Sequence, residues 1–196
     1  MTLKLNGSSS GSVSIDAPAS TTGGADVTLT LPVDDGTANQ VLTAGTGGGA
    51  LTWGGNTPAW IVKPASDQGS VAQDTATKVV WGTEEIDTDS AFASDKFTVP
   101  SGKGGLYFIQ VQVCVDDIED QKELEIRVYK NGSSILRSYS YASTDNQINM
   151  VHEHSSVHDL NASDYLEIYI VHGTSGSQTI LADKTRWSGF KLLGTS

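Results

Sequence analysis

The chain has 196 residues and a formal net charge of −11, enough for one ordinary domain and an appendage but short for two full domains. An acidic surface repels phosphate backbones, so we expect no nucleic-acid partner and no attachment to an anionic membrane through charge. Only 37% of the residues are hydrophobic and 18% are charged, low shares for a compact enzyme, and no apolar stretch is long enough to predict membrane insertion.

The first 57 residues have a composition of their own. They hold 11 of the 21 glycines, and their first aromatic residue is Trp53. Short alternating apolar stretches predict strands with one apolar face, which end at Pro18 and Pro32 because proline cannot continue a central ladder. The candidate anchor residues of this N-terminal arm are its regularly spaced apolar side chains: Val13, Ile15, Val27, Leu29, Leu31, Val41 and Leu42.

The arm is too poor in apolar residues to form a core by itself. Ordering the backbone costs about 1–2 kcal/mol per residue. One fully buried Val, Leu or Ile side chain returns only about 1.5–3 kcal/mol. We therefore expect residues 1–57 to need partners, either identical arms that wrap around one another or the surface of another protein.

Residues 58–196 have the pattern of a core-forming domain, the head. Alternation predicts strands at 78–81, 106–115, 124–130, 147–154, 165–171 and 188–193, and no window shows good helical periodicity. Turn signals such as Asn131-Gly132 separate the strands. Several short strands at this spacing predict an all-β sandwich, jelly roll or barrel.

Four motifs of the head occur in the same order as in the C1q/TNF-like jelly-roll family and resemble it. They are Phe97-Thr-Val-Pro100 with Gly105-Leu-Tyr107-Phe-Ile109, Val128-Tyr-Lys-Asn-Gly132, Leu160-Asn-Ala-Ser-Asp-Tyr-Leu-Glu-Ile168 and Trp187-Ser-Gly-Phe190-Lys-Leu192. Extra residues before Gly105 and a serine at 163, where the family prefers glycine, depart from the pattern and leave the loop shapes open. The resemblance covers residues 60–194, about two-thirds of the chain.

This resemblance implies a homotrimeric jelly-roll sandwich that binds through its outer surface and has no catalytic activity. With the extended Gly/Ser/Thr-rich arm, the expected fold class is all-β. Large side chains on the predicted strands are expected to fill the sandwich core or the trimer axis: Trp60, Phe97, Tyr107, Ile109, Trp187 and Phe190.

The arm has a resemblance of its own. Val13-Ser-Ile-Asp-Ala-Pro18 and Val27-Thr-Leu-Thr-Leu-Pro32 are similar to N-terminal segments of bacteriophage fibre and capsid-appendage proteins. Together with a C1q-like head, this favours a phage structural protein over a secreted animal protein. The first residues lack the order of a signal peptide and collagen repeats are absent, so we expect synthesis in the host cytoplasm and a place on the virion surface.

The densest group of candidate metal ligands is His152-Glu153-His154 with His158. Residues two apart on a strand point to one face, so His152 and His154 could chelate a metal or form a pH-sensitive contact. No cysteine or carboxylate stands at a supporting spacing, so solvated histidines are the preferred interpretation. The acidic run at 116–120 could supply calcium ligands, but a solvated loop is again preferred. We expect no cofactor, and a structural metal ion lacks support.

Three tyrosines near the Asn131-Gly132 turn, Tyr129, Tyr139 and Tyr141, are candidates for binding a glycan or protein on a host surface. The sequence has no strand-turn-helix serine, phosphate loop or dinucleotide fingerprint, so we expect no enzyme.

The leading hypothesis is a trimeric virion appendage of a bacteriophage, in which each chain joins two identical copies. The arm would attach to a capsid or tail protein while the head projects outward. We favour a capsid decoration or head-fibre protein, because no folded docking module precedes the arm. A tail fibre that binds a host receptor and a free C1q-like module that binds carbohydrate or protein are the alternatives. A glycan-cleaving enzyme on a jelly-roll scaffold is the least favoured one.

Overall fold

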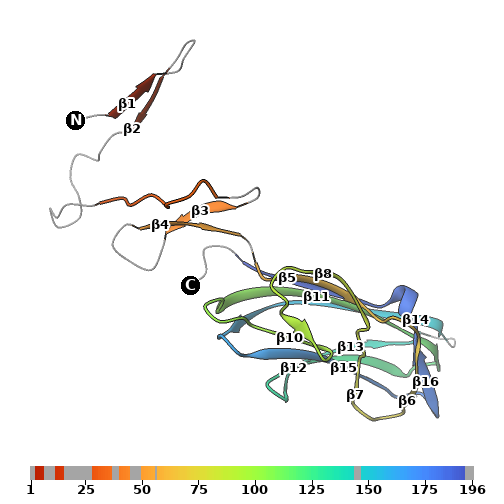
Figure 1. Cartoon of the computed structure of the whole chain (residues 1–196). Coiled ribbons are helices and arrows are strands. Elements are labelled where there is room, and N and C mark those ends of the chain that lie inside the picture. Colours follow the sequence, from red (N-terminus) through yellow and green to blue (C-terminus); the bar gives the residue numbers. More distant parts are fainter. Residues whose placement is uncertain are drawn as a thin grey trace. The chain divides into compact units, whose positions relative to one another are not determined.

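The computed structural model of the chain describes residues 3–6, 12–15, 28–36, 40–44, 50–55, 57–143 and 147–192. The chain divides into two units, Met1–Gly55 and Asn56–Ser196, each of which is described by itself (Figure 1). The described residues form β-strands and one 3-10 turn, η2 (Ala182–Lys184), so the predicted all-β class is confirmed. None of the described helices is long and apolar enough to cross a membrane.

The N-terminal unit contains two antiparallel hairpins. β1 (Leu3–Asn6) pairs with β2 (Ser12–Ile15), and β3 (Val41–Ala44) pairs with β4 (Leu51–Gly54). A parallel bridge joins Thr30 to Ala50 beside the second hairpin. Short two-stranded pairs bury little apolar surface, which agrees with the sparse hydrophobic content of this part of the sequence.

Trp53 holds the second hairpin together with the segment that precedes it. Its indole Nε1 donates a hydrogen bond to the carbonyl of Asp34 at 2.9 Å. Gly36 lies against the ring at a φ of +68°, where an added Cβ would come within 2.6 Å of the indole. This tryptophan therefore packs inside its own unit.

The C-terminal unit is a sandwich of two antiparallel sheets, seen as two layers in Figure 1. The first, named the β12 sheet, has the order β13-β12-β15-β10-β9, and β7 also pairs with β15. Its strands are β7 (Thr77–Lys78), β9 (Phe92–Ala93), β10 (Lys96–Thr98), β12 (Glu123–Lys130), β13 (Ser133–Tyr141) and β15 (Tyr165–His172).

The second, named the β11 sheet, has the order β6-β16-β11-β17-β5-β8, and β14 pairs with β11. Its strands are β5 (Ala59–Lys63), β6 (Gln68–Ala72), β8 (Thr83–Asp87), β11 (Gly105–Ile118), β14 (Gln147–Leu160), β16 (Ser177–Ile180) and β17 (Arg186–Lys191).

The core lies between the two sheets and follows the alternation of the sequence. On β11, the odd-numbered residues from Tyr107 to Val115 are fully buried, and β12 and β15 bury their even-numbered residues from the opposite sheet. Asn131 and Gly132 take φ values of 52° and 79°, as a tight hairpin turn between β12 and β13 requires. The buried aliphatic residues of β12 and β15 are Leu124, Ile126, Val128, Leu166, Ile168 and Ile170.

A cluster of aromatic rings closes the end of the core near β5 and β17. Trp60 stacks on Phe97 at 3.7 Å between ring centroids and meets Trp187 edge-on at 5.7 Å. Gly189 lies beneath Trp60, where a Cβ would stand 2.4 Å from two ring carbons. The glycine is therefore required by the close approach of the indole to the backbone of β17.

Two predicted strands differ from the observed ones. The strand expected at 78–81 is reduced to the two residues of β7, because the chain crosses there from the β12 sheet toward β8. The strand expected at 147–154 runs on to Leu160, because β11 pairs with it along nearly its whole length. The polar strand β13 was not predicted at all, since serines occupy much of its inward face.

Candidate functional site

The outer face of the β11 sheet carries apolar side chains in two adjacent cross-strand rows, together named here the apolar outer row. Val157, Phe108 and Phe190 lie in one row, and Ile61 and Ile86 lie in the next, where Ile61 is opposite Ser188 of β17. Phe108 of β11 is opposite Val157 of β14 on one side and Phe190 of β17 on the other. The two phenylalanine rings are 5.4 Å apart between centroids. Ile61 of β5 is opposite Ile86 of β8.

Three side chains of this row remain open to solvent within one chain. The exposed fraction is 37% for Phe190, 44% for Ile86 and 52% for Val157. Isolated exposed apolar residues are normal on protein surfaces, but several of them on neighbouring strands of one sheet face are typical of an interaction site.

Ion pairs border the apolar outer row. Glu85 accepts from Lys63 at 3.0 Å and also from Arg186. The hydrogen bond from Lys63, with the charge of Arg186, holds the pKa of Glu85 below its ordinary value. The row therefore has a charged border, as expected of an interface with an apolar centre and a polar rim.

Five of the six residues expected at the core or the trimer axis lie inside the core of a single chain: Trp60, Phe97, Tyr107, Ile109 and Trp187. Burial, with the nearby Asp89, raises the pKa of Tyr107 to about 12, and its hydroxyl donates to the carbonyl of Lys103 at 2.6 Å. These five side chains cannot touch a neighbouring chain. Phe190 alone of the six faces outward.

The sequence reasoning missed the other members of the apolar outer row. Phe108 and Val157 each lie one position away from a residue that faces the core, so their side chains point to the outer face. The available signal was a strand with large apolar residues at both odd and even positions, because such a pattern is typical of strands that are covered on both faces.

The outer face of the β12 sheet is different, because it carries tyrosines and arginines. Glu125 of β12 is only 2% exposed, and it accepts hydrogen bonds from Arg127 at 2.8 Å and from Arg137 of β13 at 3.1 Å. Arg137 Nε also donates to the same carboxylate. Burial alone would raise the pKa of Glu125, but the hydrogen bonds from the two guanidinium groups outweigh it and lower the pKa.

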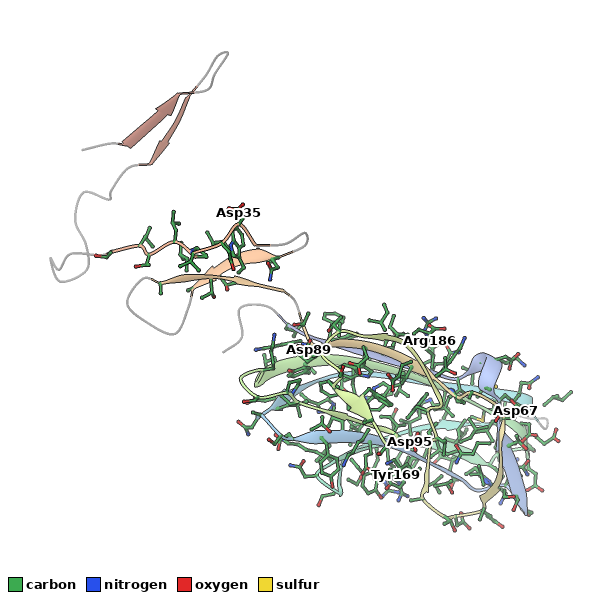
Figure 2. The ribbon with its side chains drawn as sticks, in the orientation of Figure 1. Asp35, Asp67, Asp89, Asp95, Tyr169 and Arg186 are labelled. Atoms are coloured by element: carbon green, nitrogen blue, oxygen red, sulfur yellow. The ribbon has the colours of Figure 1, made fainter. Side chains whose placement is uncertain are left out.

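The three candidate tyrosines share this outer face. Tyr139 and Tyr141 lie on β13, opposite Glu125 and Glu123, and are 44% and 65% exposed. Tyr129 packs against Tyr169 of β15 at 4.2 Å between ring centroids. Figure 2 labels Tyr169 on this layer and Arg186 on the opposite one, so the aromatic surface and the apolar outer row belong to opposite faces of the head.

The histidines of β14 do not match the expectation of solvated side chains. His152 is 6% exposed and points between the sheets, where Ser140 Oγ lies 2.7 Å from its Nδ1 and Ser138 Oγ lies 3.1 Å from its Nε2. The solvated interpretation was wrong for His152 because β13 crosses over its inward face. Burial lowers the pKa of His152, His154 and His158.

The weak metal candidates His152 and His154 have no third candidate ligand beside them among the described residues. Within the described ranges, no three His, Cys, Asp or Glu side chains are grouped so that they could hold a metal ion. The acidic run at the end of β11 is also engaged elsewhere. Asp116 accepts the backbone N–H of Thr179 on β16 at 2.6 Å. Glu119 accepts that of Ser175, in the β15–β16 connection, at 3.3 Å.

Four of the candidate anchor residues of the arm are exposed in its unit. The exposed fractions are 64% for Leu29, 69% for Leu31, 47% for Val41 and 41% for Leu42. Val13 and Ile15 belong to β2, whose backbone alone is described, and Val27 lies outside the described residues.

Comparison with known proteins places the head among solved jelly rolls. No family model and no curated protein matches the chain. The globular domain of zebrafish complement 1qA protein is 16% identical, with a TM-score of 0.50, and the match covers 69% of this chain and 98% of that one.

Two further structures agree. Murine APRIL at pH 5.0 is 15% identical (68% of this chain, 98% of that one), and Eiger TNF from S. frugiperda is 17% identical (68% and 91%), both with a TM-score of 0.50. The fold of the head is therefore a C1q/TNF-like jelly roll, as the sequence motifs predict.

Proposed function

We propose that the chain is a non-enzymatic, homotrimeric virion protein of a bacteriophage, anchored by its N-terminal arm with the jelly-roll head projecting outward. The observation that carries the trimer is the apolar outer row of the β11 sheet. Phe190, Ile86 and Val157 are more than a third exposed, although they stand on the strands of a well-packed head. A partner that covers the row removes this apolar area from water.

A second copy of the chain is the partner that the fold favours. The resemblance of the sequence motifs to the C1q/TNF-like family predicts that the chain forms a homotrimer. In a closed ring of three copies, each chain packs one surface against a different surface of its neighbour. The apolar outer row of every copy is then covered. Each square ångström of apolar surface that the ring covers contributes roughly 25 cal/mol.

The test of the trimer is the mass of the purified chain in solution by light scattering at micromolar concentration. The expected mass is three times the 20.6 kDa of one chain. Phe108→Glu should convert the trimer into a folded monomer, because it places a charge in the apolar outer row. Val80→Glu, at an exposed site outside the row, is the matched control and should remain trimeric. A folded wild-type monomer would overturn the trimer.

The arm supports the virion part of the proposal. Its segments resemble those of phage fibre and capsid-appendage proteins, and Leu29 and Leu31 present exposed apolar side chains that a capsid protein could cover. The arm would lie along the particle, and the acidic heads would keep neighbouring appendages apart by repulsion. A capsid decoration or head fibre fits this arrangement, with a tail fibre as the alternative placement.

The virion role is tested on purified particles. Quantitative mass spectrometry should find the chain in copy numbers that are multiples of three. Limited proteolysis should cleave residues 1–57 in the isolated protein but not on the particle. Particles without the chain, or an arm equally sensitive in both states, would exclude the role, whatever the oligomeric state of the head.

A free binding module is the second candidate function. The structural neighbours favour it, because zebrafish complement 1qA, murine APRIL and Eiger TNF are all animal proteins rather than parts of a virus particle. In that case the arm would serve as a linker. The module would be found in solution apart from any particle, and the trimer test would still give three copies.

A further inference from the structure

The outer face of the β12 sheet differs in charge from the rest of the head. Residues 58–196 hold 11 Lys and Arg against 19 Asp and Glu. The outward positions of this sheet hold four cations against three carboxylates: Lys78, Lys96, Arg127 and Arg137 against Glu123, Glu125 and Glu167. This face therefore has a net charge of +1, so the rest of the head carries more negative charge than the head as a whole. An anionic ligand therefore meets less repulsion on this face than on the rest of the head.

Two arginines on this face are held in fixed orientations. The nearly buried Glu125 binds Arg127 and Arg137 together, so the group of three carries one surplus positive charge. Half of the Arg137 side chain is exposed, and Glu125 engages only its Nε and Nη2. A guanidinium group that is already oriented loses little entropy when it pairs with a carboxylate.

Exposed aromatic rings lie beside these guanidinium groups. Arg137 lies over the ring of Tyr139 at 5.4 Å from its centroid, and Tyr141 follows two residues later on the same face of β13. The electron-rich face of a tyrosine ring attracts the C–H groups of a sugar, and its hydroxyl offers a hydrogen bond. Aromatic rings that alternate with guanidinium groups are complementary to a polymer in which sugar rings alternate with carboxylates.

We propose that the outer face of the β12 sheet binds an acidic polysaccharide, a polymer of uronic acids, in which Arg137 and Arg127 pair with the carboxylates and Tyr139 packs on a sugar ring. The site needs residues of one chain only. It extends the proposed function by assigning a ligand class to the head, and it does not depend on a virion location or on the trimer.

The experiment is calorimetric titration of the full chain with polygalacturonate, alginate and hyaluronate at about 0.05 M and about 0.15 M salt, with neutral dextran as the reference. At least one acidic polymer should bind, more weakly at the higher salt, and dextran should not. Absence of binding by all three acidic polymers would overturn the proposal.

Variants separate this site from general charge attraction. Arg137→Gln should weaken the affinity about tenfold, and Tyr139→Ala several-fold, because each removes one of the two kinds of contact. Lys184→Gln, on η2 and away from the β12 sheet, removes one positive charge elsewhere and should leave the affinity unchanged. Circular dichroism verifies that each variant is folded. Arg137→Lys keeps the positive charge but removes the planar guanidinium group that can bind a carboxylate through two N–H groups.

Polyglutamate tests the competing ligand class, an acidic peptide. It carries carboxylates without sugar rings, so it should bind more weakly than the polysaccharide and should not respond to Tyr139→Ala. Equal affinity for polyglutamate, or an equal loss of affinity with Lys184→Gln, would show that charge alone is recognised and would overturn the proposed site. Neither result would affect the mass or particle experiments that test the trimer and the virion role.

Discussion

Phe108 of β11 and Phe190 of β17 stand opposite each other on the outer face of the β11 sheet, with ring centroids 5.4 Å apart. Their nearest neighbours along the two strands, Tyr107 and Gly189, are buried on the core side. Both faces of these central strands therefore carry large apolar groups, one inside the core and one on the outer face. This two-sided pattern distinguishes β11 and β17 from an ordinary half-solvated strand.

The first prediction concerns Phe190→Ala. Since the ring lies outside the core, its loss should change the stability of an isolated head by less than about 1 kcal/mol. The same change should weaken the proposed trimer, because the ring belongs to the apolar outer row. Thermal unfolding across a hundredfold range of protein concentration measures this: the wild-type midpoint should rise with concentration, and that of the variant should rise less. Concentration-independent midpoints for both proteins would contradict the prediction.

The second prediction concerns Gly189→Ala. An added Cβ would stand 2.4 Å from two carbons of the Trp60 ring, which is itself stacked on Phe97. We expect the head to lose about 1–3 kcal/mol, because the indole must leave its packed position. Urea unfolding followed by tryptophan fluorescence measures the loss. Gly69→Ala is the matched control on β6, where a Cβ meets no heavy atom within 4 Å, and it should unfold like the wild type.

The third prediction concerns Glu125→Gln. The substitution removes the shared charge between Arg127 and Arg137 and leaves two guanidinium groups close together. We expect a loss of about 1–3 kcal/mol in the free energy of unfolding, the usual cost of leaving charged hydrogen-bond partners unmatched. Glu153→Gln on β14, an exposed carboxylate, is the comparison and should cost less than about 0.5 kcal/mol. Equal effects of the two changes would contradict this assignment.

The fourth prediction is a loss of stability in mild acid. Burial lowers the pKa of His152, His154 and His158 below the ordinary value of 6.5. The unfolded chain therefore binds more protons than the folded head in mild acid, and protonation favours unfolding. Above about pH 6.5 the free energy of unfolding is not reduced by these histidines. It should fall progressively as the pH drops below that value toward the pKa of the folded state.

Urea unfolding at pH 8, 6.5 and 5 measures this dependence. Most carboxylates stay ionised over this range, so they add little to the change. Replacement of His152, His154 and His158 by Asn should flatten the profile between pH 6.5 and 5. A wild-type profile that is already flat over this range would contradict the prediction.

Much of the head was predictable because alternation along a strand is a local property. The positions of Tyr107, Ile109 and the odd-numbered valines of β11 determine that they share a face, whatever the strand pairs with. The Asn131-Gly132 turn is equally local, since its φ values depend on two residues. The motifs from Phe97 to Leu192 added the jelly-roll type of the sandwich, which periodicity does not contain.

The surfaces were less predictable. β13 has serines at Ser138 and Ser140 on its inward face, a pattern typical of a solvated segment until His152 of β14 is placed against them. Arg137 and Glu125 are 12 residues apart, and only the pairing of β12 with β13 brings them into contact. Likewise, Phe108 and Phe190 become neighbours only through the β11–β17 ladder.

The amino-acid sequence by itself determined the class of the fold, the strands with a buried face and the distinct character of the arm, because these depend on composition and on neighbours two positions away. Only the tertiary structure decided which apolar residues fill the core and which remain on the outer face. Tyr107 and Phe108 are both large and both lie on β11, and nothing in their local spacing distinguishes them. The second sheet covers one face of β11 and leaves the other free, and that choice depends on contacts between residues far apart in the chain.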